Sequence, residues 1–125
     1  MTEDSIDELS DAKFESQVLN AEHASILAFG SPWSGPSRRL RETFSRISRD
    51  FEGIRTAWIN VDENPQVAGN YSVKSVPTVL LFEDGKVIER RLGAIPAHSL
   101  RELCEQAAQP EQAGSGGPRT LPRRS

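Results

Sequence analysis

The sequence predicts one α/β domain in which a mixed β-sheet carries helices on both faces. Apolar runs typical of strands alternate along the chain with apolar residues at helical spacing. An Asp-Gly pair, Asp84-Gly85, separates the last two strand-like runs and is the strongest short-range signal for an antiparallel hairpin. The length of 125 residues and the 36% hydrophobic content fit a single compact domain.

The first predicted elements are a short helix and a buried strand. Phe14, Val18 and Leu19 lie on one side of a helix over residues 12–20. Residues 25–29 form a continuous apolar run, which is expected for a strand that is covered on both faces.

A long amphipathic helix is predicted to follow Pro36 and to end near Gly53. Its apolar residues recur at spacings of four, three and four: Leu40, Phe44, Ile47 and Phe51. Its other face is charged and rich in arginine. The charged residues on it are Arg38, Arg41, Glu42, Arg46 and Arg49. We expect a solvated surface there, with docking of an acidic partner as the alternative.

Five further elements complete the predicted order α-β-α-β-α-β-β-α. In sequence they are a strand over 54–61, a short helix over 64–71, a strand over 76–82, its hairpin partner over 86–92 and a last helix over 97–108. Cys104 lies on the apolar stripe of this last helix and is expected to be a small buried hydrophobe.

The two ends of the chain differ from its middle in composition. Residues 1–8 are set apart as an acidic N-terminal segment, because residues 1–11 carry five acidic side chains and no basic one, a net charge of −5. Residues 109–125 carry three arginines and one glutamate, net +2, and their glycine and proline content predicts a flexible tail. The folded domain is therefore assigned to residues 9–108.

Composition argues against several functional classes. Fifteen basic and 18 acidic side chains give a net charge of −3, which does not favour nucleic acid as a partner. No apolar run reaches the roughly 18 residues that span a membrane, and the first ten residues lack a signal-peptide pattern, so a cytoplasmic protein is expected. One cysteine and two histidines offer little for a metal site, and no cofactor is expected.

A five-residue motif, Trp33-Ser34-Gly35-Pro36-Ser37, follows the first buried strand and opens the long helix. The tripeptide Val76-Pro77-Thr78 follows about forty residues later at the start of the hairpin. Together they resemble the thioredoxin family, whose active site reads Trp-Cys-Gly-Pro-Cys and faces a cis-proline loop. The resemblance extends through Asp62-Glu63-Asn64-Pro65 and Gly93-Ala94, and it implies a thioredoxin fold over residues 9–108.

The resemblance also implies a shallow groove for protein or peptide substrates in an extended conformation. The residues that would line it are Trp33, Gly35, Pro36, Val76, Pro77, Gly93 and Ala94. The family's activity is protein-disulfide reduction, and a thioredoxin reductase is the implied partner that recycles it.

Ser34 and Ser37 occupy the positions of the family's two redox cysteines. Disulfide exchange needs a thiolate at the helix N-terminus and a second thiol that resolves the mixed disulfide. A serine hydroxyl can supply neither, so the chain is predicted to be inactive as a dithiol–disulfide oxidoreductase. Ser34 is expected to cap the helix. A serine hydrolase would need a base, and the fold that the resemblance implies places neither His23 nor His98 beside the motif.

Two interpretations remain open. In the first, a thioredoxin has lost its two cysteines by mutation while the rest of the motif and Pro77 persist. In the second, a natural non-redox member of the family binds, holds or assembles partner proteins through the same groove. Ala28 and Trp58 favour the second, since they match the positions of a buried aspartate and its lysine partner in the family. A purely structural subunit that docks through its basic helix or a tail is a third possibility.

Overall fold

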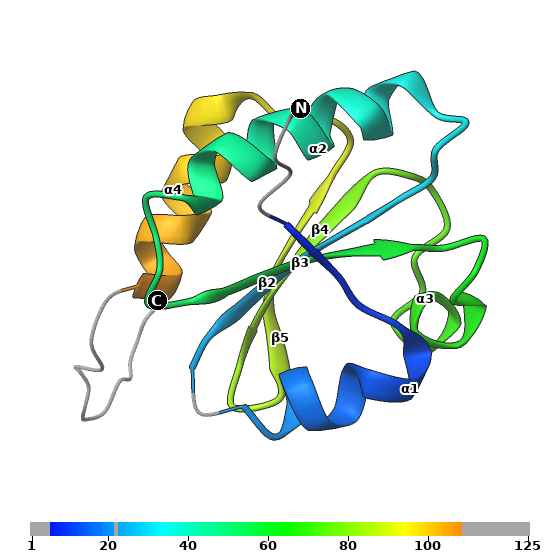
Figure 1. Ribbon diagram of the computed structural model, residues 1–125, viewed down its shortest axis with the longest axis horizontal. Coiled ribbons are helices and arrows are strands. Elements are labelled where there is room, and N and C mark those ends of the chain that lie inside the picture. The colour runs from blue at the N-terminus through cyan, green and yellow to red at the C-terminus, as the bar shows by residue number, and fades with distance from the viewer. Residues whose placement is uncertain (1–5, 22, 109–125) are drawn as a thin grey trace.

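A five-stranded mixed sheet forms the centre of the computed structural model, which describes residues 6–21 and 23–108 (Figure 1). The strands lie in the order β1-β3-β2-β4-β5. Their bounds are β1 Asp7–Glu8, β2 Ser25–Gly30, β3 Arg55–Asn60, β4 Thr78–Glu83 and β5 Lys86–Leu92. The first three strands run parallel, and β4 is antiparallel to both β2 and β5.

Helices cover both faces of this sheet. They are α1 Asp11–Phe14, which continues as the π-helical turn η1 Glu15–Leu19, then α2 Gly35–Ser48, α3 Pro65–Asn70 and α4 Ala97–Ala108. α2 and α4 lie on one face, whereas α1 and α3 lie on the other (Figure 1). The predicted α/β class, a mixed sheet with helices on both faces, is confirmed.

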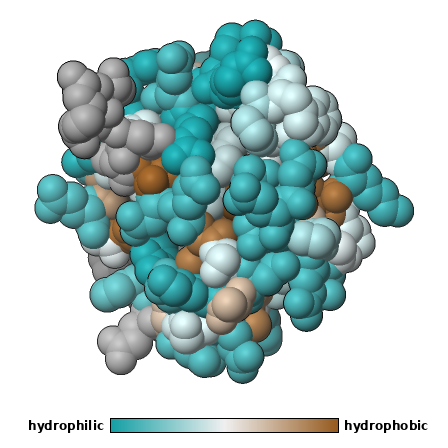
Figure 2. Space-filling view, turned by 45° about the vertical axis from the view of Figure 1, so that its right-hand side comes forward, coloured by the Kyte–Doolittle hydropathy of each residue, from teal (hydrophilic) through white to brown (hydrophobic). Residues whose placement is uncertain are grey.

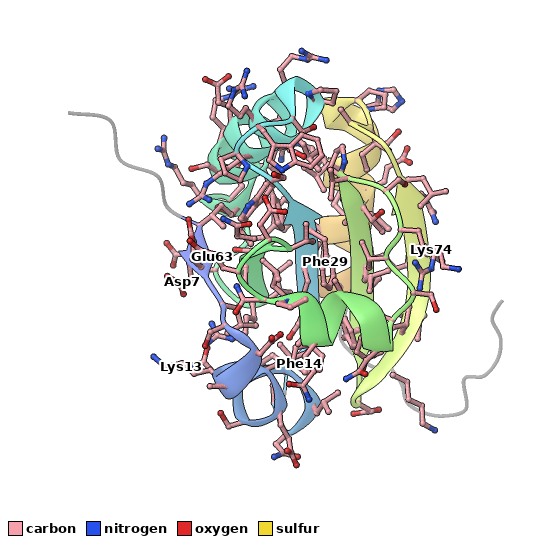
Figure 3. All side chains as sticks on the ribbon, turned by 90° about the vertical axis from the view of Figure 1, so that its right-hand side faces the viewer. Asp7, Lys13, Phe14, Phe29, Glu63 and Lys74 are labelled. Carbon is pink, nitrogen blue, oxygen red and sulfur yellow. The ribbon has the colours of Figure 1, made fainter. Side chains whose placement is uncertain are left out.

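Strand β2 separates two apolar cores because its side chains alternate between the faces. Ile26 and Ala28 belong to the core under α2 and α4, and Leu27 and Phe29 belong to the core under α1 and α3. Figure 3 shows Phe14 and Phe29 inside this second core, with Lys13 and Lys74 pointing outward. Burial of such large side chains stabilises the fold by about 1.5–3 kcal/mol each.

The strand β1 was not predicted. Its two side chains, Asp7 and Glu8, are exposed and acidic, so the sequence has no strand-like apolar pattern there. The neighbouring Ile6 and Leu9 are buried, one in each core, and β1 pairs with β3. The sheet therefore begins within the acidic segment 1–8, while the tail expected over 109–125 lies outside the described residues.

The element boundaries differ from the prediction most clearly at the end of α2 and the start of β4. α2 ends at Ser48 rather than near Gly53, and β4 begins at Thr78, after a cis peptide bond between Val76 and Pro77. Within the described ranges, no helix is long and apolar enough to cross a membrane. The same residues bring no three His, Cys, Asp or Glu side chains together around a possible metal position.

Candidate functional site

Strand register brings the motif and the proline loop to one end of the sheet. The motif follows the carboxyl end of β2, and Pro77 precedes the amino end of the antiparallel β4, where Phe29 pairs with Thr78. Leu92, at the end of β5, is the other neighbour of Thr78. The N–H of Gly93 then donates to the Pro77 carbonyl at 2.8 Å, which ties this turn to the proline loop.

We call the residues at this end the motif surface: Trp33, Gly35, Pro36, Val76, Pro77, Leu92, Gly93 and Ala94. Strand pairing and the Gly93–Pro77 hydrogen bond place Leu92 and Gly93 beside the proline loop, and Leu92 was not among the lining residues expected from sequence. The large apolar side chains that are exposed in the described chain are Trp33, at 70%, Leu92, at 65%, and Ile88, at 41%. Figure 2 shows apolar surface as small patches among polar side chains.

Ser34 is the N-cap of α2, as predicted. Its Oγ accepts a hydrogen bond from the Ser37 N–H at 3.2 Å, and its carbonyl accepts one from the Arg38 N–H at 3.0 Å. Within the described chain no histidine hydrogen-bonds to either serine of the motif. Ser34 therefore has the geometry of a structural cap and lacks the base that a nucleophile requires.

Ser37 is fully buried one turn into α2. Its hydroxyl has no hydrogen-bond partner among the described residues. A buried hydroxyl without a partner costs about 1–3 kcal/mol of stability. This serine therefore occupies an environment that suits a less polar side chain better.

Alanine substitutions at the two serines are expected to have opposite effects on the free energy of unfolding. Ser34→Ala removes the helix cap and is expected to destabilise the protein by about 1 kcal/mol. Ser37→Ala removes an unsatisfied hydroxyl and is expected to stabilise it by about 1 kcal/mol. Urea denaturation followed by circular dichroism measures both. Equal losses from the two substitutions would contradict the assigned environments.

An apolar ring fills the space between the motif and β3. Trp58 is buried, and its ring lies so close to Gly30 that a Cβ built on Gly30 would be 2.2 Å from Trp58 Cζ2 and 3.1 Å from the Cβ of Ser37. On β2, Ala28 is also fully buried. The two positions that match the family's charged pair therefore carry apolar side chains here.

The Trp58 ring packs against the charged side chain of Arg41 in α2. The Arg41 guanidinium lies 5.3 Å from the centre of the Trp58 ring, within the range of a cation–π interaction. Arg41 also forms a 2.8 Å ion pair with Glu8 of β1. This arrangement connects β1, α2 and β3 beneath the motif, and the sequence offered no signal for it.

Asp62 positions the exposed ring of Trp33. The Trp33 indole N–H and the Ser31 hydroxyl both donate to Asp62 Oδ2 at 2.8 Å. The indole is thus oriented while most of its surface stays open to solvent. No sequence pattern indicated a role for Asp62 or Ser31, although Asp62 belongs to the segment that carries the family resemblance.

Val76 presents free backbone groups beside the motif. Its N–H and C=O form no hydrogen bond within the part of the chain that the structure describes. The next carbonyl, that of Pro77, is already occupied by Gly93, whose φ of 87° suits glycine. An extended peptide laid along Val76 would find one donor and one acceptor there.

Cys104, the free cysteine of the chain, has a buried and unreactive thiol. It is buried in the core under α2 and α4, as predicted, and burial raises the pKa of its thiol to about 12, an effect that the nearby Arg101 only partly opposes. The thiol is therefore protonated at neutral pH. Only a thiolate attacks a disulfide, so Cys104 is not expected to take part in disulfide exchange.

Comparison with known proteins gives consistent matches over the described domain. The thioredoxin family model matches residues 5–106. Thioredoxin 1 of Nostoc sp. is 33% identical over 100 residues, which cover 79% of this chain and 94% of the relative. The thioredoxin of Synechocystis sp. is 34% identical over 100 residues, with 79% and 94% covered. The thioredoxin of Rhodospirillum rubrum is 35% identical over 99 residues, with 78% and 95% covered.

Proposed function

Because the chain belongs to the thioredoxin family, we propose that it binds extended protein segments on the motif surface without exchanging disulfides. The family supports a thioredoxin-type role with protein substrates. The observation that carries the second half of the proposal is the pair Ser34 and Ser37 in place of cysteine, one capping α2 and the other buried. Neither oxygen can form the sulfur–sulfur bond of a mixed disulfide.

The binding half of the proposal rests on three features of the motif surface. Trp33 and Leu92 offer exposed apolar area, and Asp62 holds the Trp33 ring in one orientation. An ordered aromatic side chain binds with little loss of conformational freedom. The free backbone groups of Val76 complement these contacts, since they can pair with an extended chain.

The second candidate is a protein-disulfide reductase that has lost its activity only through the replacement of its two cysteines by serine. The unchanged Trp33, Gly35, Pro36 and Pro77 favour it, because non-redox work does not require Gly-Pro in the motif. A thioredoxin reductase would then be the partner of the parent activity. Trp58 and Ala28 favour the non-redox function, since these two buried positions carry neither a carboxylate nor an amine. The cytoplasmic location stays a prediction.

Removal of the Trp33 ring is expected to abolish most of the peptide binding. The probe is a fluorescein-labelled peptide that alternates leucine with glutamine and contains no cysteine, and the measurement is fluorescence anisotropy. Trp33→Ala is expected to weaken its affinity at least about tenfold, the effect of losing a central aromatic anchor. The matched control is Ile88→Ala, which removes an exposed apolar side chain of β5 outside the motif surface. Equal affinities of Trp33→Ala and the unaltered protein would contradict the proposed function.

A further inference from the structure

We propose that the motif surface selects extended segments that carry a carboxylate side chain, and that Arg38 and Arg39 bind this carboxylate. The inference rests on the proposed function and adds the chemical class of the partner. It concerns the edge of the motif surface that the first turn of α2 forms.

Both guanidinium groups face the same residue of the motif. The point at which a Cβ would sit on Gly35 lies 3.6 Å from Arg39 Nη1 and 3.9 Å from Arg38 Nη2. Gly35 has no side chain to separate them from a ligand. Arg38 is further oriented by a 2.7 Å hydrogen bond from its Nη1 to the Pro32 carbonyl. Two cationic groups thus lie next to each other at the border of the motif surface.

Neither arginine has an anionic partner within the described chain. Other arginines do: Arg41 pairs with Glu8, Arg55 with Asp7, Arg91 with Glu89 and Arg101 with Asp50. No ion pair joins Arg38 or Arg39 to Glu42, one turn further along α2, and the first turn contains no acidic residue. Asp62, the carboxylate nearest to Trp33 in the fold, already accepts two hydrogen bonds. Adjacent guanidinium groups without a counter-charge favour an external anion.

The neighbouring surface decides what kind of anion fits. Trp33 and Leu92 offer apolar contacts, and Val76 offers backbone hydrogen bonds, so the ligand needs apolar side chains and a peptide backbone as well as charge. An extended segment with alternating apolar and acidic residues meets all three requirements. A small inorganic anion supplies only the negative charge.

The test compares two labelled peptides that differ only in charge. One alternates leucine with glutamine, and the other alternates leucine with glutamate. We expect the unaltered protein to bind the glutamate peptide about tenfold more tightly at low salt, and to lose most of this preference in about 0.5 M salt. In the variant Arg38→Gln/Arg39→Gln the preference is expected to vanish while the affinity for the glutamine peptide is unchanged. The control Arg46→Gln/Arg49→Gln removes the same charge at the C-terminal end of α2, where Arg49 is the C-cap, and is expected to keep the preference.

Each outcome has a distinct meaning. Equal affinity of the unaltered protein for both peptides would overturn the inference and leave the proposed function intact. Equal loss of preference in the two arginine variants would also overturn it, because the effect would then come from net charge alone. Inorganic phosphate that displaces the glutamate peptide more strongly than sodium chloride of equal ionic strength would reduce the site to one for small anions and overturn peptide selection. If the protein bound neither peptide, the proposed function and this inference would both fail.

Discussion

Gly30→Ala is expected to be the most destabilising single substitution at the motif end of the sheet. The added Cβ would lie 2.2 Å from Trp58 Cζ2 and 2.7 Å from Cη2, whereas carbon atoms pack at about 3.5–4 Å. Trp58 is 3% exposed and its ring is rigid, so it cannot move aside without disturbing α2. Overpacking costs about 1–3 kcal/mol and occasionally more, and the 2.2 Å approach places this substitution at the upper end of that range. The free energy of unfolding in urea measures the loss.

Two further variants make this prediction specific. Gly69→Ala, in α3, adds the same methyl group where, apart from its chain neighbours and the backbone of its own helix, no atom lies within 4 Å, and it is expected to change stability by less than about 1 kcal/mol. In Gly30→Ala/Trp58→Leu the clash is removed, so the two substitutions are expected to be coupled by about 2 kcal/mol. If Gly30→Ala alone does not fold, recovery of folded protein in the double variant is the readout. Simple additivity, or a Gly30→Ala protein of unchanged stability, would contradict the packing of Trp58 described above.

The sequence predicted correctly those elements that are specified by residues close together in the chain. The apolar run over 25–29 became the buried strand β2, and Asp84-Gly85 formed the hairpin turn with positive φ values of 53° and 77°. Ser34 became the N-cap of α2 for the same reason, because its preference acts within one helical turn.

What could not be predicted depends on partners that are distant in the sequence. β1 forms because its backbone pairs with β3 at the edge of the sheet, while its own side chains remain exposed to solvent. Likewise, the hydrogen bond from Trp33 to Asp62 and the packing of Trp58 on Gly30 each join residues about thirty positions apart. Neither pair has a local pattern, so the resemblance to a family identified the motif but not the contacts that support it.

Replacement of both motif serines, Ser34→Cys/Ser37→Cys, is expected to confer disulfide reduction on a chain that we propose has none. A thiolate at position 34 would attack a substrate disulfide, form a mixed disulfide and release one substrate thiolate. The thiolate at position 37 would then displace the second substrate sulfur, so that both substrate sulfurs leave reduced and the protein holds the new disulfide. Dithiothreitol would return it to the dithiol. The N-terminus of α2 would stabilise the first thiolate.

Single substitutions separate the two roles. Without dithiothreitol, Ser34→Cys alone is expected to form a mixed disulfide once per molecule and no further product, because the protein offers no second accessible thiol to resolve it. Ser37→Cys alone is expected to be inert, since position 37 is fully buried. Because Trp58 and Ala28 provide no proton acceptor beneath the motif, we expect the double variant to work more slowly than a thioredoxin that has the charged pair.

Insulin-disulfide reduction with dithiothreitol, followed by turbidity, tests the central claim most directly. We expect the unaltered chain to match the dithiothreitol blank and Ser34→Cys/Ser37→Cys to exceed it at least about tenfold. Reduction above the blank by the unaltered chain would contradict the claim that the motif surface binds protein segments without exchanging their disulfides.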